Sequence, residues 1–266
     1  MAKISQKAIA MPASAIRKLV PHADAAKKEG VKVYHLNLGQ PDIKSPECAL
    51  DAVRNFSDEN VSYSHSAGLM DLRKGLVEKY YKKIGIDITV DELIVTVAGS
   101  ESVNLALEIT CNPGDEVIVL EPFYTNYNTF AFMNGLTLKA IPTDIRNGFQ
   151  IPPIEEFEKA ITEKTKAILV CNPGNPTGTQ YSKESMLALG EIARKHDLFL
   201  LSDEVYREFC YTDEPHFSAM NIPGLEQNVV LIDSVSKRYN LCGARVGCIV
   251  SHNKEVMTAA MKFAQA

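Results

Sequence analysis

Short, unbroken apolar runs recur along the chain and are separated by longer segments with helical periodicity. The apolar runs, each predicted to form a strand, span residues 93–97, 116–120, 136–141, 166–170, 198–201, 229–232 and 246–250. The helical segments span residues 70–81, 102–109, 154–161, 183–196 and 253–265. A run that is apolar at every position is typical of a strand buried on both faces. The pattern therefore predicts an α/β fold with a mostly parallel sheet and helices on both faces.

The N-terminal part of the chain does not follow this alternation. Residues 1–30 are mildly amphipathic and predicted to be helical, whereas residues 31–38 alternate like a short strand that stops at Gly39-Gln40-Pro41-Asp42. A further helix is expected at residues 46–56. An arm of this kind packs on a neighbouring subunit more often than it stands alone.

Composition excludes several classes of protein. A chain of 266 residues that is 45% hydrophobic can bury a large core, as a compact soluble enzyme does. The net charge of −5 and the lack of a basic run argue against nucleic-acid binding. The six cysteines form no Cys-x-x-Cys pair and no metal-ligand spacing with histidine, so we expect no metal and a reducing compartment. Because no stretch has the length of a membrane span and the N-terminus lacks a signal-peptide core, we expect a cytoplasmic protein without a membrane partner.

Polar residues follow several predicted strands at the point where each strand ends. They are Gly99, Ser100, Glu101, Tyr124, Asn175, Asp203, Tyr206, Ser234, Ser236 and Lys237, with Arg245 just before the last strand. Each has an ordinary explanation when taken alone: a capped helix, a turn or a surface lysine. Ligands of parallel sheets bind beyond the carboxyl ends of the strands, however, and these residues converge on one such edge. The convergence favours a ligand site.

Two of these segments indicate the chemistry of the ligand. A strand followed by Gly99, by Ser100 as a plausible N-cap and by a helix is an anion-binding arrangement, because the first helical N–H groups are free. Lys237 follows the apolar run in Ser234-Val235-Ser236-Lys237. The ordinary lysine pKa of about 10.4 would be lowered by burial and by a nearby cation such as Arg245, which would make Lys237 a nucleophile.

The segment Ser234-Val235-Ser236-Lys237-Arg238-Tyr239-Asn240-Leu241-Cys242-Gly243-Ala244-Arg245-Val246-Gly247 resembles the pyridoxal-phosphate attachment signature of class I aminotransferases, which have the type I fold. The resemblance extends from Gly39-Gln40-Pro41-Asp42 through Asn172-Pro173-Gly174-Asn175-Pro176-Thr177-Gly178 and Asp203-Glu204-Val205-Tyr206. It therefore covers nearly the whole chain, and the aspartate aminotransferases are the most similar branch.

The resemblance implies a role for each strand-end residue. Lys237 would form a Schiff base with the cofactor and move a proton during transfer of an amino group between an aspartate-like amino acid and a 2-oxo acid. Asp203 would pair with the pyridine nitrogen, Asn175 and Tyr206 would bond the phenolic oxygen of the ring, and Tyr124 would stack on the ring. The phosphate would be held by the backbone of Gly99, Ser100 and Glu101, by Ser234 and Ser236, and by Arg245. Tyr63 would reach the cofactor of the second subunit of a homodimer.

The resemblance also implies a division of the chain. Residues 1–45 would form an N-terminal arm and part of a small domain, residues 46–252 the cofactor-binding large domain, and residues 253–266 the start of an interdomain helix. The family continues with a C-terminal small domain, including an arginine that binds the substrate α-carboxylate, which this chain lacks; Gly39 and Asn175 match other positions that contact the carboxylate. We therefore expect exposed apolar surface around Val256, Met257, Met261 and Phe263. A truncated gene product, a fragment and a piece made for expression would all give this sequence.

Two alternatives to an aminotransferase stay open. The same lysine and electron-accepting ring serve β-eliminating lyases of this fold. A truncated, catalytically silent chain that binds pyridoxal phosphate is equally compatible with these residues.

Overall fold

A seven-stranded mixed sheet is the centre of the computed structural model, which describes residues 2–14, 16–37, 39, 43–57 and 59–266. Its strands are β1 (Leu93–Thr96), β2 (Glu116–Glu121), β3 (Thr137–Pro142), β4 (Thr165–Cys171), β5 (Phe199–Asp203), β6 (Val229–Ser234) and β7 (Gly247–Val250). Their order is β1-β7-β6-β5-β4-β2-β3. Strand β7 alone runs opposite to the other six strands, so the prediction of a mostly parallel sheet is confirmed.

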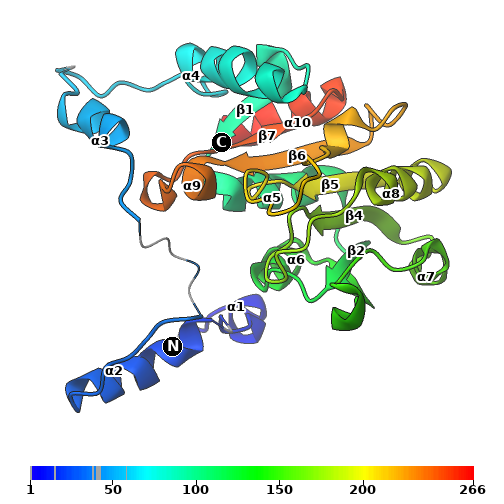
Figure 1. Cartoon of the computed structure of the whole chain (residues 1–266), viewed down its shortest axis with the longest axis horizontal. Coiled ribbons are helices and arrows are strands. Elements are labelled where there is room, and N and C mark those ends of the chain that lie inside the picture. The colour runs from blue at the N-terminus through cyan, green and yellow to red at the C-terminus, as the bar shows by residue number, and fades with distance from the viewer. Residues whose placement is uncertain (1, 15, 38, 40–42, 58) are drawn as a thin grey trace.

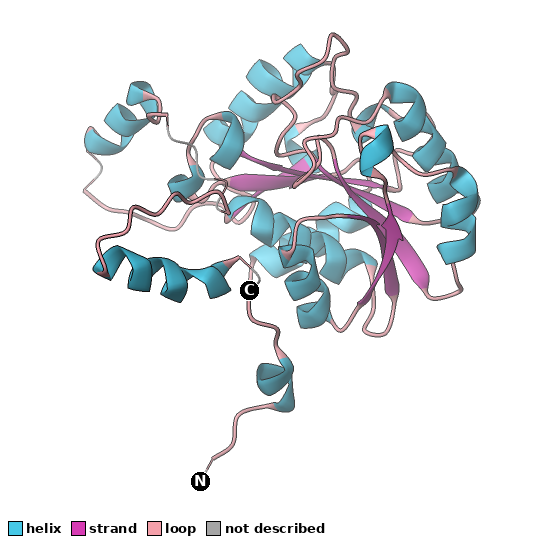
Figure 2. Cartoon of the chain, turned by 60° about the horizontal axis from the view of Figure 1, so that its bottom comes forward, coloured by secondary structure: helices cyan, strands magenta, loops and turns pink. Residues whose placement is uncertain are grey.

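Helices cover both faces of the sheet (Figures 1 and 2). The main ones are α4 (Met70–Lys74), α5 (Ala98–Thr110), α6 (Asn126–Asn134), α7 (Ile154–Ala160), α8 (Lys183–Lys195), α9 (Val235–Arg238) and α10 (Lys254–Ala264). Helix α4 continues through a π-helical turn at Gly75–Tyr80 and a 3₁₀ turn at Tyr81–Ile84. No helix of the described residues is long and apolar enough to cross a membrane.

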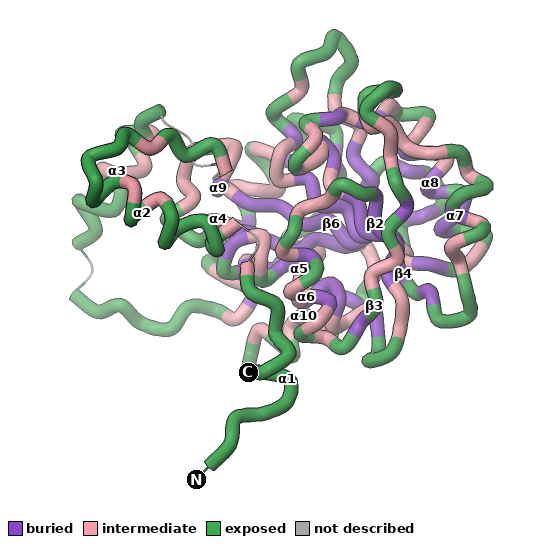
Figure 3. The backbone as a smooth tube through the Cα atoms, turned by 90° about the horizontal axis from the view of Figure 1, so that it is seen from below, coloured by how far each residue is buried: buried purple, intermediate pink, exposed green. Residues whose placement is uncertain are grey.

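The unbroken apolar strands form two cores, one on each face of the sheet. In β2, Ile118 and Leu120 join one cluster, whereas Val117 and Val119 join the other. Strand β4 divides its residues in the same alternating way. Successive side chains of a strand point to opposite faces, so a strand with helices on both sides needs apolar residues at every position. Figure 3 shows the resulting buried layer through the centre of the molecule.

The N-terminal part, which comprises the described residues up to residue 66, lies beside this layered body (Figure 1). Its helices α1 (Gln6–Ala10), α2 (Val20–Lys28) and α3 (Glu47–Arg54) have no buried residue. The strand predicted at residues 31–38 is wrong for its described residues 31–37, which are not in a strand. Residues 31–37 pair with no partner strand in the described part of the chain, and Leu36 is 95% exposed. A strand needs such a partner for its backbone hydrogen bonds.

Three other sequence predictions need correction. Helix α5 begins at Ala98, so Ser100 lies in its first turn and is not the N-cap, which is Val97. The sequence Asn126–Asn134 forms helix α6, which was not predicted because its apolar residues do not gather on one face. Finally, Val256 and Met257 are buried, because α10 packs against the cluster that contains α5 residues, and only Phe263 of the expected apolar surface is largely exposed.

Candidate functional site

Neighbouring strands bring the predicted polar residues to one edge of the sheet. Asp203 at the end of β5 lies opposite Cys171 at the end of β4 and opposite Ile232 near the end of β6. Ser234, the last residue of β6, lies opposite Gly247, the first residue of the antiparallel strand β7. The segments that follow β4, β5 and β6 and precede β7 therefore meet above the same edge, as the sequence predicts.

Asp203 is a buried carboxylate at the centre of this edge, with 6% of its surface exposed. Its Oδ2 accepts a hydrogen bond of 2.7 Å from the Tyr127 hydroxyl, and its Oδ1 accepts one of 3.3 Å from the Val205 amide. No lysine, arginine or histidine of the described residues forms an ion pair with it. Burial raises the pKa of Asp203 to about 6. A buried carboxylate without a cationic partner is costly, and a positively charged ligand atom would relieve that cost.

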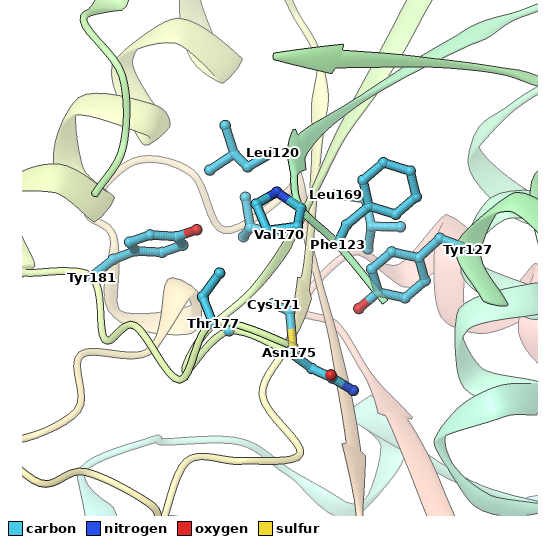
Figure 4. Close-up of a pocket in the computed structure, with 11 residues that line it drawn as sticks. Leu120, Phe123, Tyr127, Leu169, Val170, Cys171, Asn175, Thr177 and Tyr181 are labelled. Carbon is cyan, nitrogen blue, oxygen red and sulfur yellow. The ribbon is translucent and has the colours of Figure 1, made fainter. Parts of the chain in front are cut away.

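Tyr127 was not recognised from the sequence. It lies on α6, is 1% exposed, and its ring meets the ring of Tyr124 edge-on at 5.5 Å between centroids. Figure 4 shows its hydroxyl on the same side of a small pocket as the side chains of Cys171 and Asn175. Tyr124 precedes α6 and Tyr127 lies in its first turn, so helical spacing could not have predicted the contact between the two rings.

Lys237 lies on α9, directly after β6. The Ser234 hydroxyl begins this helix by accepting a hydrogen bond of 3.1 Å from the Ser236 amide. The Lys237 Nζ donates to the Gly39 carbonyl at 3.4 Å and lies 5.9 Å from the centre of the Tyr206 ring. The Tyr206 hydroxyl in turn accepts a hydrogen bond of 3.3 Å from the Asn175 side chain. The lysine, the phenol and the amide thus come together although they follow three different strands.

The first turn of α5 lies against the end of β6. A Cβ placed on Gly99 would lie 3.7 Å from the Ser234 Cβ, so the backbone there closely approaches the serine. The Ser234 and Ser236 hydroxyl oxygens are 2.7 Å apart. The Glu101 carboxylate is turned back and accepts a hydrogen bond from the Val97 amide. Free helical N–H groups beside two hydroxyls suit a phosphate group.

The charges of Asp203 and Arg245 both act on the Tyr124 hydroxyl. Burial and the Asp203 charge raise the pKa of Tyr124, whereas the Arg245 charge opposes this rise. The Arg245 side chain is exposed and donates to the Cys242 carbonyl at 2.9 Å. Its residue adopts a positive φ of 54°, which turns the chain into β7.

Two other predicted positions lie outside this cluster. The Tyr63 side chain is fully exposed, with a relative surface of 106%. Gly39 contributes its carbonyl, as described, whereas Gln40, Pro41 and Asp42 lie outside the described residues. The structure therefore gathers every strand-end residue at one edge and leaves Tyr63 apart.

The fold and this edge define an α/β protein whose strand ends can hold a flat, anionic ligand with a cationic ring atom beside the amine of Lys237. Residues 31–266 match the model of the aminotransferase class I and II family, and the chain belongs to this family.

Two curated relatives and a solved structure show the extent of the similarity. The chain is 34% identical to aspartate aminotransferase of Thermotoga maritima over 261 residues, which are 98% of this chain and 68% of that protein. It is 34% identical to aspartate/prephenate aminotransferase of Thermus thermophilus over 93% of this chain and 63% of that protein. The structure of Thermus thermophilus aspartate aminotransferase with maleate has a TM-score of 0.91 and 32% identity, and the match covers all of this chain and 68% of that one. The chain thus spans about two thirds of the length of these proteins.

The residues at the edge fit pyridoxal phosphate, the cofactor that the family implies. The buried, unpaired Asp203 carboxylate suits the ring nitrogen, and the first turn of α5 with Ser234 and Ser236 suits the phosphate. The Lys237 amine follows the two serines in the chain and lies 5.9 Å from the centre of the Tyr206 ring.

Proposed function

We propose that this chain binds pyridoxal phosphate as a Schiff base on Lys237 and takes part in the transfer of an amino group between an aspartate-like amino acid and a 2-oxo acid. The observation that carries this proposal is the buried Asp203 carboxylate, which has no cationic partner among the described residues and faces the same edge as Lys237. Bound pyridoxal phosphate supplies an aldehyde and a ring that accepts electrons when a substrate Cα–H bond breaks.

Each residue of the edge has a task in this proposal. Asp203 holds a proton on the ring nitrogen, and Tyr127 keeps the carboxylate oriented through its hydrogen bond. Asn175 and Tyr206 bond the phenolic oxygen, while Tyr124 covers the ring. Once the substrate amine has taken the place of Lys237 on the cofactor, the freed Lys237 amine would be the base that moves the proton from the substrate Cα.

The phosphate end of the site would use three segments. Backbone N–H groups of Gly99, Ser100 and Glu101 and the hydroxyls of Ser234 and Ser236 would hold the phosphate, with Arg245 supplying charge. Arg245 reaches the Cys242 carbonyl in the structure, so its side chain would turn toward the ligand on binding.

We further propose that residues 46–252 act as the cofactor-binding domain of a homodimer in the cytoplasm. The exposed apolar side chains of the N-terminal part support the dimer, since Leu36 and Val61 are 95% and 89% exposed. The six cysteines, all among the described residues, are free thiols, as is usual in a reducing compartment.

Labelling tests the cofactor assignment. Pyridoxal phosphate is added to the purified chain, the visible absorption band is recorded, and the adduct is reduced with borohydride and located by mass spectrometry. We expect one modified residue, Lys237, and no band in Lys237→Ala. Modification elsewhere, or none, would refute the proposal.

Product analysis tests the reaction. With aspartate and 2-oxoglutarate, glutamate formation supports transamination. Pyruvate and ammonia from a β-substituted amino acid would instead identify a lyase, and neither product would identify a silent chain.

A further inference from the structure

A buried cluster of four charged side chains lies behind the helix that carries Lys237. Its members are Arg207, Arg238, Asp233 and Glu204, whose side chains are 4%, 5%, 2% and 0% exposed. Two positive and two negative charges make the cluster neutral. The proposed function uses none of these residues, and burying a charge without an opposite charge beside it is costly.

Asp233 and Arg238 enclose the segment that carries the lysine and the two serines. Asp233 precedes Ser234, and its Oδ1 accepts hydrogen bonds from the Ser234 amide at 2.7 Å and from Arg238 Nη2 at 2.5 Å. Its Oδ2 accepts from Arg238 Nη2 and from the Tyr81 hydroxyl, both at 2.7 Å. Because Arg238 follows Lys237 directly, this one ion pair ties both ends of residues 234–237 together.

Arg207 connects this ion pair to the strand end that carries Asp203. Its guanidinium donates to Glu204 Oε2 at 2.8 and 3.1 Å and to Asp233 Oδ2 at 3.4 Å. Glu204 follows Asp203, and its other carboxylate oxygen accepts from Ser202 and Ser218. The ends of β5 and β6 are thus joined by a bridge of charged hydrogen bonds.

An aromatic ring packs against the Arg238 end of this bridge of charged side chains. The Arg238 guanidinium lies 3.8 Å from the centre of the Tyr80 ring, which is a cation–π contact. Although burial alone would raise the pKa of Asp233, the Arg207 and Arg238 charges and hydrogen bonds hold it below its usual value. Asp233 therefore stays ionised beside the two arginines, while Arg238 Nε has no hydrogen-bond partner among the described residues.

Helix α9 has only four residues and cannot be stable by itself. We propose that Asp233, Arg238 and Arg207 are positioning residues that fix Lys237 and the Ser234 and Ser236 hydroxyls relative to Asp203. This inference rests on the proposed function, because it concerns where the amine and the phosphate-binding hydroxyls stand for the same cofactor. Without the ion pair, the amine and the hydroxyls lose their fixed spacing from the carboxylate.

The test compares Arg238→Met and Arg238→Lys with the unaltered full chain. Methionine has an unbranched, apolar side chain but no charge, whereas lysine keeps the charge and loses the fork of N–H groups. Three quantities are measured: folding by circular dichroism, the dissociation constant of pyridoxal phosphate from the visible band, and the pH midpoint of that band. Arg146→Met serves as the control, because Arg146 is 87% exposed and pairs only with Asp144.

We expect Arg238→Met to fold, to bind pyridoxal phosphate about tenfold more weakly, and to move the pH midpoint by about half a unit. Arg238→Lys should fall between this variant and the unaltered chain, and Arg146→Met should match the unaltered chain. A merely structural role would lower thermal stability and leave the midpoint unchanged, and that result would overturn the inference.

Two further outcomes are decisive. If Arg238→Met does not fold, the inference is judged on Arg238→Lys alone. It is overturned if Arg238→Lys has the same affinity for pyridoxal phosphate and the same pH midpoint as the unaltered chain. If the unaltered chain is not labelled on Lys237, the proposed function fails. The inference fails in a different way: the unaltered chain is labelled on Lys237, but the Arg238 variants bind pyridoxal phosphate as the unaltered chain does.

Discussion

The ionised Asp203 side chain destabilises the folded, ligand-free chain at the position where the proposed cofactor would bind. The carboxylate is nearly buried, and the hydrogen bonds from Tyr127 and Val205 lower its pKa without offsetting the effect of burial, which raises it to about 6. Its ionised form is therefore less favourable in the folded chain than in the unfolded one. A site that must receive a cation is expected to show this pattern, since the ligand supplies the missing charge.

Replacing Asp203 with asparagine should stabilise the cofactor-free chain at neutral pH. The folded-state pKa of about 6 lies above the unfolded value, so the folded state binds the proton more tightly and stability declines as pH rises from about 4 to about 6. Asp203→Asn removes this decline. We expect a gain in the free energy of unfolding of roughly 2–3 kcal/mol at pH 7.5 and almost none at pH 4.

Urea unfolding at both pH values measures this gain. Asp144→Asn is the control, for which the stability change should have the opposite sign. Hydrogen bonds from Arg146 lower the pKa of Asp144, so loss of the Asp144 carboxylate should slightly destabilise the chain at pH 7.5. A variant Asp203→Asn that is less stable than the unaltered chain at pH 7.5 would contradict the argument. The same variant should bind pyridoxal phosphate more weakly.

The sequence predicts the positions of some site residues in the fold but not those of others. Lys237 and Asp203 follow unbroken apolar strands, so their position at the edge could be derived. Tyr127 could not, because its contact with Asp203 depends on how α6 packs against the sheet. Asp233 and Arg238 adjoin the predicted site, yet nothing in the local pattern says that they pair with each other, and the pairing arises only from the short turn between them.

At the scale of elements, strands were predicted well because a buried strand leaves a strong pattern. All seven apolar runs became strands, with ends that differ by a few residues at most. Helix α6 was missed because the sequence Asn126–Asn134 has no continuous apolar face. The strand expected at residues 31–38 is absent from the described residues 31–37, since a strand needs a partner strand that the sequence pattern does not specify.

Gly247 sets how closely α5 approaches β6. A Cβ at this position would lie 2.5 Å from the Ala98 carbonyl carbon, 2.7 Å from the Gly99 nitrogen and 2.8 Å from the Asp233 carbonyl oxygen. All three are backbone atoms, which cannot move independently of the turn. The glycine therefore lets the phosphate-binding turn of α5 lie against the end of β6.

Gly247→Ala should lower the free energy of unfolding by about 1–3 kcal/mol, because the backbone must shift to admit a methyl group. Since the shift displaces the Gly99 N–H from Ser234, affinity for pyridoxal phosphate should fall as well. Urea unfolding and the visible-band titration measure the two effects. Gly243→Ala is the matched control: its Cβ would meet no atom of the described residues within 4 Å, so its stability should change by at most about 0.5 kcal/mol. Equal stability of the two variants would contradict this role of Gly247.

At the scale of the whole molecule, the N-terminal part is unusual in burying almost nothing of its own. Leu36, Val61 and Tyr63 are nearly or completely exposed, whereas α10 at the other end packs its apolar face into the core. Apolar surface of this extent on a folded chain is typical of an interface with another molecule. A second copy of the chain is the partner that the proposed function requires, because Tyr63 would reach the cofactor of the other subunit and its side chain is fully exposed in this chain.

Mixed dimers test whether Tyr63 serves the site of the neighbouring subunit. Light scattering after gel filtration should first give twice the mass of one chain. Tyr63→Phe removes one hydroxyl that would bond a charged phosphate, so we expect pyridoxal phosphate to bind about tenfold more weakly or worse, and Lys237→Ala should form no reducible adduct.

When Tyr63→Phe and Lys237→Ala chains are unfolded together and refolded, each mixed dimer contains one site with both Lys237 and a partner tyrosine. That site should regain the affinity of the unaltered protein. If Tyr63 instead acted within its own chain, every Lys237 in the mixture would still lack its tyrosine, and no high-affinity labelling would return. The control refolds the double variant with the unaltered chain: its mixed dimers should lose high-affinity labelling only if the tyrosine acts across the interface.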